Sequence, residues 1–189
     1  ARAATPGIHP AFVTMVRELV QERTGGRVVI QVHSDAEYGT EQEIWEQLAL
    51  GGVDFARLSL AIVADDLPKL NVLQLPYLYR DAAHMWRVLD GTLGEDFLQE
   101  FTRRELVGLS WYDAGARSFY AKQPIRSLND VAGKTVRVQD SQIVLDMMKL
   151  LGAQPVTFAY SDVYSAFQTG KIDAAENNWP AYYRMDHYK

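Results

Sequence analysis

Three arginines lie in or directly beside segments that the sequence predicts to be β-strands: Arg57, Arg117 and Arg137. The planar guanidinium group of arginine offers two parallel charge-assisted hydrogen bonds, which suits it to grip a carboxylate. In the predicted strand 135–139, alternation sends Arg137 to the face opposite two valines. Strands of an α/β sheet are normally apolar on both faces, so this polar face indicates an exposed edge or a cleft wall. The three arginines together suggest an acidic ligand.

The densest polar and aromatic patch is residues 176–183, Glu-Asn-Asn-Trp-Pro-Ala-Tyr-Tyr, which directly follow a predicted buried strand. Asparagine can donate to and accept from hydroxyl groups, and a flat aromatic ring can cover the C–H side of a sugar or an extended acid. The alternative is an aromatic loop that plugs the end of the sheet. Tyr160, at the end of another predicted strand, can line the same crevice or simply pack.

Common catalytic motifs are absent from the sequence, including G-x-S-x-G, H-E-x-x-H, the Walker loop, G-x-G-x-x-G and the EF-hand loop. The four histidines are scattered, and none has another three or four residues further on, as a helical metal pair often does. We expect structural or surface histidines, no metal and no cofactor. With no cysteine, the chain has no disulfide, thiolate metal site or cysteine nucleophile.

The elements that must position these residues alternate between helix and strand. Apolar spacing predicts a helix over 9–23, and period-two alternation predicts a strand over 27–33. Thr40 and Glu43 have capping-box spacing ahead of a helix that Gly51-Gly52 end. The further expected strands are 53–59, 107–113, 117–125, 135–139, 155–158 and 172–175, with 70–79 extended and helices over 81–89, 94–104 and after Ser141 and Ser161. This alternation predicts an α/β fold with a largely parallel sheet.

One pattern occurs twice. Gly51-x-x-Asp54-x-x-Arg57 and Gly170-x-x-Asp173-x-x-Glu176 have the same form at a constant offset of 119 residues. The match is short enough to arise by chance. If it is real, it indicates two similar α/β lobes with polar residues at the carboxyl ends of strands, where ligands of open α/β sheets bind.

The composition is that of an ordinary globular protein. The chain has 189 residues, 48% of them hydrophobic, and 19 Lys and Arg against 24 Asp and Glu give a net charge of −5. Nucleic acid is a poor candidate partner, because phosphate binding needs clustered cations. The longest mainly apolar run, 58–64, is far shorter than the ~20 residues of a membrane span, and the chain shows no export-signal pattern.

The sequence closely resembles a known family in several segments. GARSFY, PIRSLNDVAGKTVRVQDS, LGAQPVTFAYSDVYSAFQTGKIDAAENNWP and HYK resemble the DctP-type solute receptors of tripartite ATP-independent periplasmic (TRAP) transporters, as do TGGRVVIQV, YGTEQE, LPYLYRDAAHM and LDGTLGE. The resemblance implies a periplasmic, non-enzymatic binding protein of the type II periplasmic-binding-protein class. Such a protein has two α/β lobes with a ligand cleft between them and delivers an organic acid to a membrane permease. We place lobe I at 1–114 and lobe II at 115–189.

The resemblance also implies roles for particular residues. Arg137 is expected to be the principal carboxylate clamp, Arg117 a second cation near it, and Asn177 a partner from the far wall. The positions of Arg57 and Tyr160 in the sequence imply that these two residues also line the cleft. RVQDS, AENNWP and HY resemble members that bind glucuronate or galacturonate. The full expected ligand set is Arg137, Arg117, Asn177, Arg57, Tyr160, Gln139, Glu41 and Trp179.

Three expected departures from the family and two rival functions stand beside this interpretation. The family's export signal, first strand and C-terminal region are expected to be missing from these 189 residues. The first rival is an α/β enzyme acting on sugar acids, with Glu41, Glu176 or His84 as acid or base. The second is a structural or interaction module.

Overall fold

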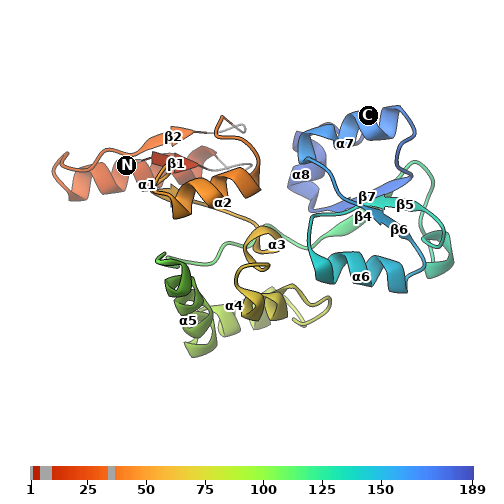
Figure 1. Ribbon diagram of the computed structural model, residues 1–189, viewed down its shortest axis with the longest axis horizontal. Coiled ribbons are helices and arrows are strands. Elements are labelled where there is room, and N and C mark those ends of the chain that lie inside the picture. Colours follow the sequence, from red (N-terminus) through yellow and green to blue (C-terminus); the bar gives the residue numbers. More distant parts are fainter. Residues whose placement is uncertain (1, 5–9, 34–36) are drawn as a thin grey trace. The chain divides into compact units, whose positions relative to one another are not determined.

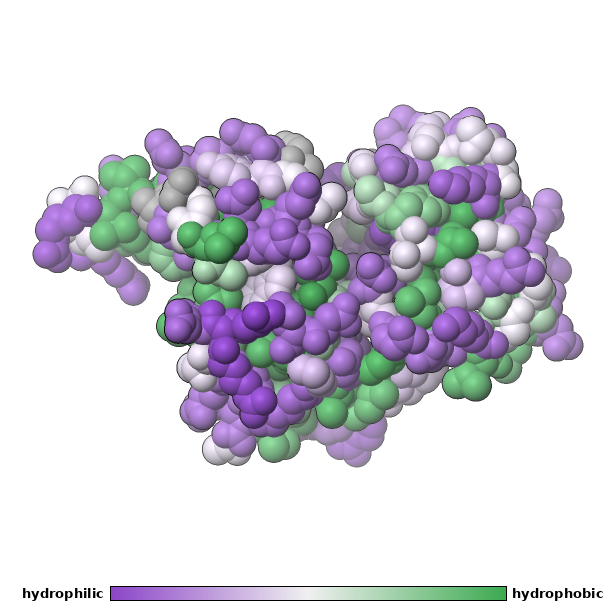
Figure 2. Space-filling model, viewed as in Figure 1, coloured by the Kyte–Doolittle hydropathy of each residue, from purple (hydrophilic) through white to green (hydrophobic). Residues whose placement is uncertain are grey.

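The structure is a computed structural model that describes residues 2–4, 10–33 and 37–189. It divides into two compact units, one formed by 1–70 with 79–109 and the other by 71–78 with 110–189 (Figure 1). The predicted α/β class is confirmed. Figure 2 shows hydrophilic side chains spread over the visible face, with smaller hydrophobic patches among them. None of the helices in the described part of the chain is long and apolar enough to cross a membrane.

Unit 1 begins with a three-stranded parallel sheet in the order β2-β1-β3. In its register, Ala4 of β1 lies beside His33 of β2 on one side and Ala56 of β3 on the other. The expectation that the family's first strand is missing is therefore wrong: three residues are too few to show alternation in a sequence, yet they pair on both sides. The elements are β1 (Arg2–Ala4), α1 (Pro10–Arg23), β2 (Gln31–His33), α2 (Glu41–Ala49) and β3 (Phe55–Ala56).

The predicted capping box at the start of α2 is confirmed. The Thr40 hydroxyl accepts from the Glu43 amide at 3.2 Å, and the Glu43 carboxylate accepts from the Thr40 amide at 2.7 Å. Ile44 of the following turn is buried against Val53, so the cap fixes where α2 meets the unit's core.

Between the strands of the two units the chain is largely helical, and two expectations about this region are wrong. Residues 70–79 are not extended, because a 3₁₀ helix runs through the first half of them, and residues 107–113 form no strand although their apolar residues alternate. Val107 and Leu109 are both exposed, so their alternation marks no buried face. The elements are α3 (Leu60–Val63), η1 (Pro68–Gln74), α4 (Ala82–Leu89), α5 (Thr92–Gln99) and η2 (Glu100–Arg104).

Unit 2 is built on a four-stranded sheet in the order β4-β7-β5-β6, in which only β4 runs antiparallel to its neighbour. In Figure 1, α6 covers one face of this sheet, and α7 and α8 lie on the other. The elements are β4 (Ser118–Ala121), η3 (Leu128–Asp130), β5 (Thr135–Arg137), α6 (Gln142–Leu150), β6 (Gln154–Val156), η4 (Tyr160–Asp162), α7 (Val163–Gln168), β7 (Ala174–Asn177) and α8 (Trp179–Arg184).

Strand alternation divides the side chains of unit 2 between two cores. Val136 and Val138 are fully buried with Met148 of α6 on one face. Ala175 packs on the other face with Val163 of α7. Arg137 is therefore on the α7 face, opposite the valines as predicted. The exposed-edge interpretation is wrong, since β7 and β6 flank β5 on both sides.

The repeated sequence pattern is a structural repeat. The order β2-β1-β3 in unit 1 matches β6-β5-β7 in unit 2, with the same β-α-β-α-β sequence of elements. Gly51 and Gly170 have φ values of 72° and 70°, a left-handed conformation that glycine adopts at no steric cost. Val53 and Ile172, again 119 residues apart, are both 1% exposed. The amides of Leu50, Gly51 and Gly52 donate to the carbonyls of Glu46, Leu48 and Gln47, and residues 169, 170 and 171 donate to Ser165, Phe167 and Ala166 in the same pattern.

Candidate carboxylate-binding site

Arg137 is a buried arginine at the end of an interior strand. Its residue is 6% exposed, and its Nε and Nη2 atoms donate to the Phe158 carbonyl at 3.3 and 2.8 Å. The guanidinium carbon lies 5.9 Å from the Phe158 ring centre and 6.0 Å from that of Tyr160. The group is thus fixed in orientation by one carbonyl and two aromatic rings.

No described carboxylate forms an ion pair with Arg137. The Phe158 carbonyl takes two of its five N–H groups, and the other three have no partner among the described residues. Burial lowers the pKa of Arg137, and the negative charge of Glu176 opposes that shift. A buried cation without a bonded anion is energetically costly. This guanidinium group could therefore bind an anionic group of a ligand.

Glu176 and Arg117 form a tight pair beside Arg137. Arg117 donates through Nε to one carboxylate oxygen of Glu176, and through Nη2 to the other at 3.0 Å. Glu176 is 5% exposed and also accepts from the Gln139 amide at 3.3 Å. The charges of this pair cancel, so the cluster of Arg117, Arg137 and Glu176 has a net charge of +1.

Asn177 is the last residue of β7 and is 8% exposed. Its Oδ1 atom accepts from the amide of Asn178 at 2.9 Å, which leaves the side-chain amide group as the donor end. Asn178 caps α8 by accepting from the Ala181 amide at 2.8 Å. Asn177 can therefore donate to a ligand oxygen.

Tyr160 connects the arginine to α8. Its hydroxyl donates to the Ala181 carbonyl at 2.9 Å, while its ring faces the Arg137 guanidinium. Burial raises the pKa of Tyr160 to about 12, against the opposing charge of Arg137. Because the hydroxyl is already bonded, the structure presents this residue as an aromatic wall.

The remaining predicted ligand residues of unit 2 are less enclosed. Gln139 follows β5 and is half-buried, and its backbone holds Glu176. Trp179 begins α8 and is 61% exposed, with its ring 5.7 Å from the Tyr182 ring centre. Five of the predicted residues, together with Trp179 at the start of α8, thus gather around the carboxyl ends of β5 and β7 and the start of β4.

In unit 1, Arg57 and Glu41 lie together at the carboxyl edge of the sheet. Arg57 directly follows β3, Glu41 begins α2, and their charged atoms are 3.8 Å apart. Both side chains are about three-quarters buried. The repeat places Arg57 in unit 1 where Glu176 stands in unit 2, so equivalent positions have opposite charges.

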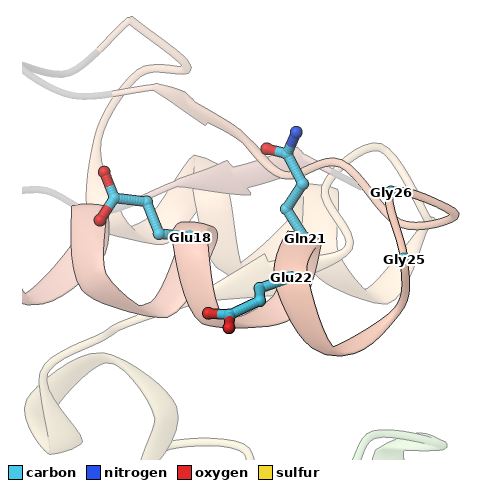
Figure 3. A pocket seen from close by; sticks show the side chains of 5 residues that line it. All are labelled: Glu18, Gln21, Glu22, Gly25 and Gly26. Carbon is cyan, nitrogen blue, oxygen red and sulfur yellow. The ribbon is translucent and has the colours of Figure 1, made fainter.

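Two cavities in the described part of the chain are lined by other residues than Arg137, Glu176 and Asn177. One of about 450 Å³ follows the end of α1, and Figure 3 shows Glu18, Gln21 and Glu22 projecting from that helix beside Gly25 and Gly26. Its two carboxylates make it unsuitable for an acid. Another, of about 360 Å³, lies in unit 2, and its lining residues include Tyr120 of β4, His187 and Tyr188.

Comparison with known proteins shows the family. Residues 3–189 match the family described as bacterial extracellular solute-binding protein, family 7 (DctP). The chain belongs to this family. A solute-binding protein of Chromohalobacter salexigens is 36% identical over 171 residues, which are 90% of this chain and 51% of the relative. The chain spans about half the length of the curated relatives it matches.

Solved structures of family 7 receptors are similar throughout the chain. A TRAP periplasmic solute binding protein from Xanthobacter autotrophicus, with bound β-D-galacturonate, is 41% identical with a TM-score of 0.93, covering 99% of this chain and 64% of that one. One from Citrobacter koseri, with bound D-glucuronate, is 35% identical with a TM-score of 0.93 and the same coverage.

Sequence reasoning missed two contacts of this cluster. It treated Arg117 as a free cation, although Glu176 is bonded to it from 59 positions away. It also set aside His187, which packs beside Tyr160 with a ring-centre distance of 5.7 Å. A charged residue inside the buried strand Ala174–Asn177 was the one sequence signal that could have suggested the first.

Proposed function

We propose that this chain is part of an extracytoplasmic solute receptor that binds a hexuronate, glucuronate or galacturonate, for a TRAP transporter. Arg137 binds the carboxylate in this proposal, and Asn177 donates to a neighbouring oxygen. The observation that carries it is a buried guanidinium with three N–H groups unused among the described residues.

The charge of the cluster supports an acid with a single carboxylate. Glu176 neutralises Arg117, so one ligand carboxylate balances Arg137 and leaves no excess charge. A dicarboxylate brings a second negative charge that this cluster does not offset. The side-chain amide group of Asn177 suits a hydroxyl group, which can accept a hydrogen bond from it.

The site is a poor match for the alternative, an enzyme acting on sugar acids. Both carboxylate oxygens of Glu176 accept hydrogen bonds from Arg117, so Glu176 is poorly placed to act as a general base. Glu41 faces Arg57, and the Nδ1 atom of His84 accepts from the Arg80 amide at 3.3 Å. Relatives are described as solute-binding proteins. Residues held in this way suit binding without chemical change.

The expected location and partners follow from the family. Relatives include a C4-dicarboxylate-binding and a sialic acid-binding periplasmic protein. We therefore place this receptor in the periplasm, with the membrane permease subunits of a TRAP transporter as its partner and with no role for nucleic acid. Its ligand-binding residues, and the lobes at 1–114 and 115–189, belong to the same proposal.

The test is a calorimetric titration of the full-length protein that contains this chain with galacturonate, glucuronate and succinate. We expect one of the uronates to bind at least about a hundredfold more tightly than succinate, because sites built for hydroxyl groups reject analogues that lack them. Succinate binding as tightly as both uronates would refute the sugar-acid proposal. NMR of the ligand after incubation separates a receptor, which returns it unchanged, from an enzyme.

A further inference from the structure

One row of residues crosses the sheet of unit 2 beneath α7 and α8. Tyr120 of β4 pairs with Ala175 of β7, which pairs with Arg137 of β5. Paired residues point to the same face, so the side chains of Tyr120 and Arg137 stand on one face, about 10 Å apart across two strand spacings. The small side chain of Ala175 separates them.

A second set of contacts joins the same two residues through aromatic rings. His187 stacks on Tyr120 with ring centres 5.5 Å apart and planes inclined by 26°, and its Nδ1 atom is 2.8 Å from the Tyr120 hydroxyl oxygen. It meets Tyr160 edge-on at 5.7 Å. Tyr160 in turn faces the guanidinium group of Arg137. The chain of contacts therefore runs from β4 to the predicted carboxylate clamp.

The position of His187 is itself fixed. The preceding residue, Asp186, has φ of 57°, and this reversal brings the His187 amide to the Tyr182 carbonyl at 3.1 Å. The Nε2 atom is buried and has no described partner, so the ring is oriented by the hydrogen bond at Nδ1 together with its contacts to the two tyrosine rings. Burial lowers the pKa of His187, and the positive charge of Arg137 acts in the same direction. The ring is thus a neutral spacer beside a cation.

We infer that His187 is a positioning residue for ligand binding, which holds Tyr160 against Arg137 and thereby sets the direction of the guanidinium group. This rests on the proposed function, in which Arg137 binds a carboxylate. His187 does not touch the ligand in this proposal. Its effect on affinity therefore passes through the arginine and depends on the flat, forked shape of that side chain.

The experiment measures galacturonate affinity of the full-length protein by calorimetry for three variants. H187F keeps a ring but loses the bond to Tyr120, H187N keeps a polar group near Nδ1 but loses the ring, and H187A loses both. We expect H187A to weaken binding about tenfold, which corresponds to about 1.4 kcal/mol. H187F and H187N should each weaken it less. They also keep the test valid if H187A does not fold.

The decisive step repeats H187A in an R137K background, where no forked group remains to be oriented. The loss due to H187A should fall to within about twofold there, since the double-mutant cycle measures coupling between the two residues. An equal loss in both backgrounds would show a general structural role and overturn the inference. Y188A, which removes the adjacent exposed ring, is the matched control and should bind as the unaltered protein does.

The outcomes separate the two proposals. If the unaltered protein binds no uronate, the proposed function fails and this inference fails with it. If the unaltered protein binds galacturonate and all three His187 variants bind equally well, only the inference fails.

Discussion

Arg117 and Glu176 form a two-point ion pair between the start of β4 and the adjacent strand β7. The pair changes how many of the three arginines in the sequence lack a counter-charge from the protein. One cation is already balanced by the protein, a second in unit 1 lies beside Glu41, and Arg137 is left as the buried arginine without an ion pair among the described residues. The number of arginines in a sequence therefore overstates the charge that a ligand has to supply.

R137A should weaken uronate binding by about two to three and a half orders of magnitude. This corresponds to the ~3–5 kcal/mol lost when one member of a buried charge pair is removed. R137K keeps the charge but not the fork, and should fall between R137A and the unaltered protein. Calorimetry of the full-length protein measures both, with R126A on the exposed surface as the control. Unchanged affinity in a folded R137A protein would remove Arg137 from the site.

N177A should weaken binding less than R137A does. A neutral hydrogen bond contributes about 0.5–1.5 kcal/mol, and the loss rises to about 1–3 kcal/mol if a buried ligand oxygen is left without a partner. The comparison uses the same titration. A larger loss for N177A than for R137A would place the carboxylate at Asn177.

R117A should lower the free energy of unfolding of unit 2 by about 3 kcal/mol. It leaves the buried Glu176 carboxylate without its cation, and the figure is at the low end for a broken buried pair because the Arg117 side chain is 34% exposed. Urea denaturation measures the change. Adding E176Q should restore part of the stability, since a neutral amide needs no counter-charge. No recovery in the double variant would mean that the pair does not act as an ion pair.

G51A and G170A should each destabilise the chain by about 1–2 kcal/mol, the steric penalty of an L-residue in the left-handed region. An added Cβ meets nothing within 4 Å at either position, so the penalty comes from the backbone alone. Asparagine, which tolerates this conformation better, should lower stability less at both sites. Thermal unfolding of the four variants tests this, and a loss at only one site would contradict the equivalence of the two helix ends.

The start of α2 should depend on pH. Hydrogen bonds from Thr40 hold the pKa of the Glu43 carboxyl below its ordinary value. A carboxyl group with a lowered folded-state pKa stabilises the fold above its unfolded pKa, and this contribution disappears as the pH falls through the folded value. The protection of amide hydrogens in the first turn of α2, measured relative to their intrinsic exchange rate at each pH, should fall below about pH 4.5 in the unaltered protein. E43Q should show weaker protection at neutral pH and little of this further loss.

Sequence patterns predicted the features that depend on neighbours in the chain. The Thr40–Glu43 cap, the two opposed faces of β5 and the helix end at Gly170 all arise from residues a few positions apart. Each has a local physical cause, so a short window of sequence contains the necessary information.

Features formed by distant residues could not be predicted in this way. The bonds of Arg117 to Glu176 and of Tyr120 to His187 join residues 59 and 67 positions apart. Strand β1 escaped notice because its three residues gain their structure from two partners in space. The segment 107–113 shows the opposite error. Its apolar residues alternate as in a strand, but no described strand pairs with it and no strand forms.

The matching helix ends at Gly51 and Gly170 give this protein an internal control. Two copies of one turn, in the same polypeptide and the same solvent, share the left-handed glycine and the backbone hydrogen-bond pattern but differ in neighbouring residues and surroundings. A substitution made in one copy can therefore be judged against its counterpart 119 residues away, and any difference between the two reports the neighbouring residues and the surroundings of each turn.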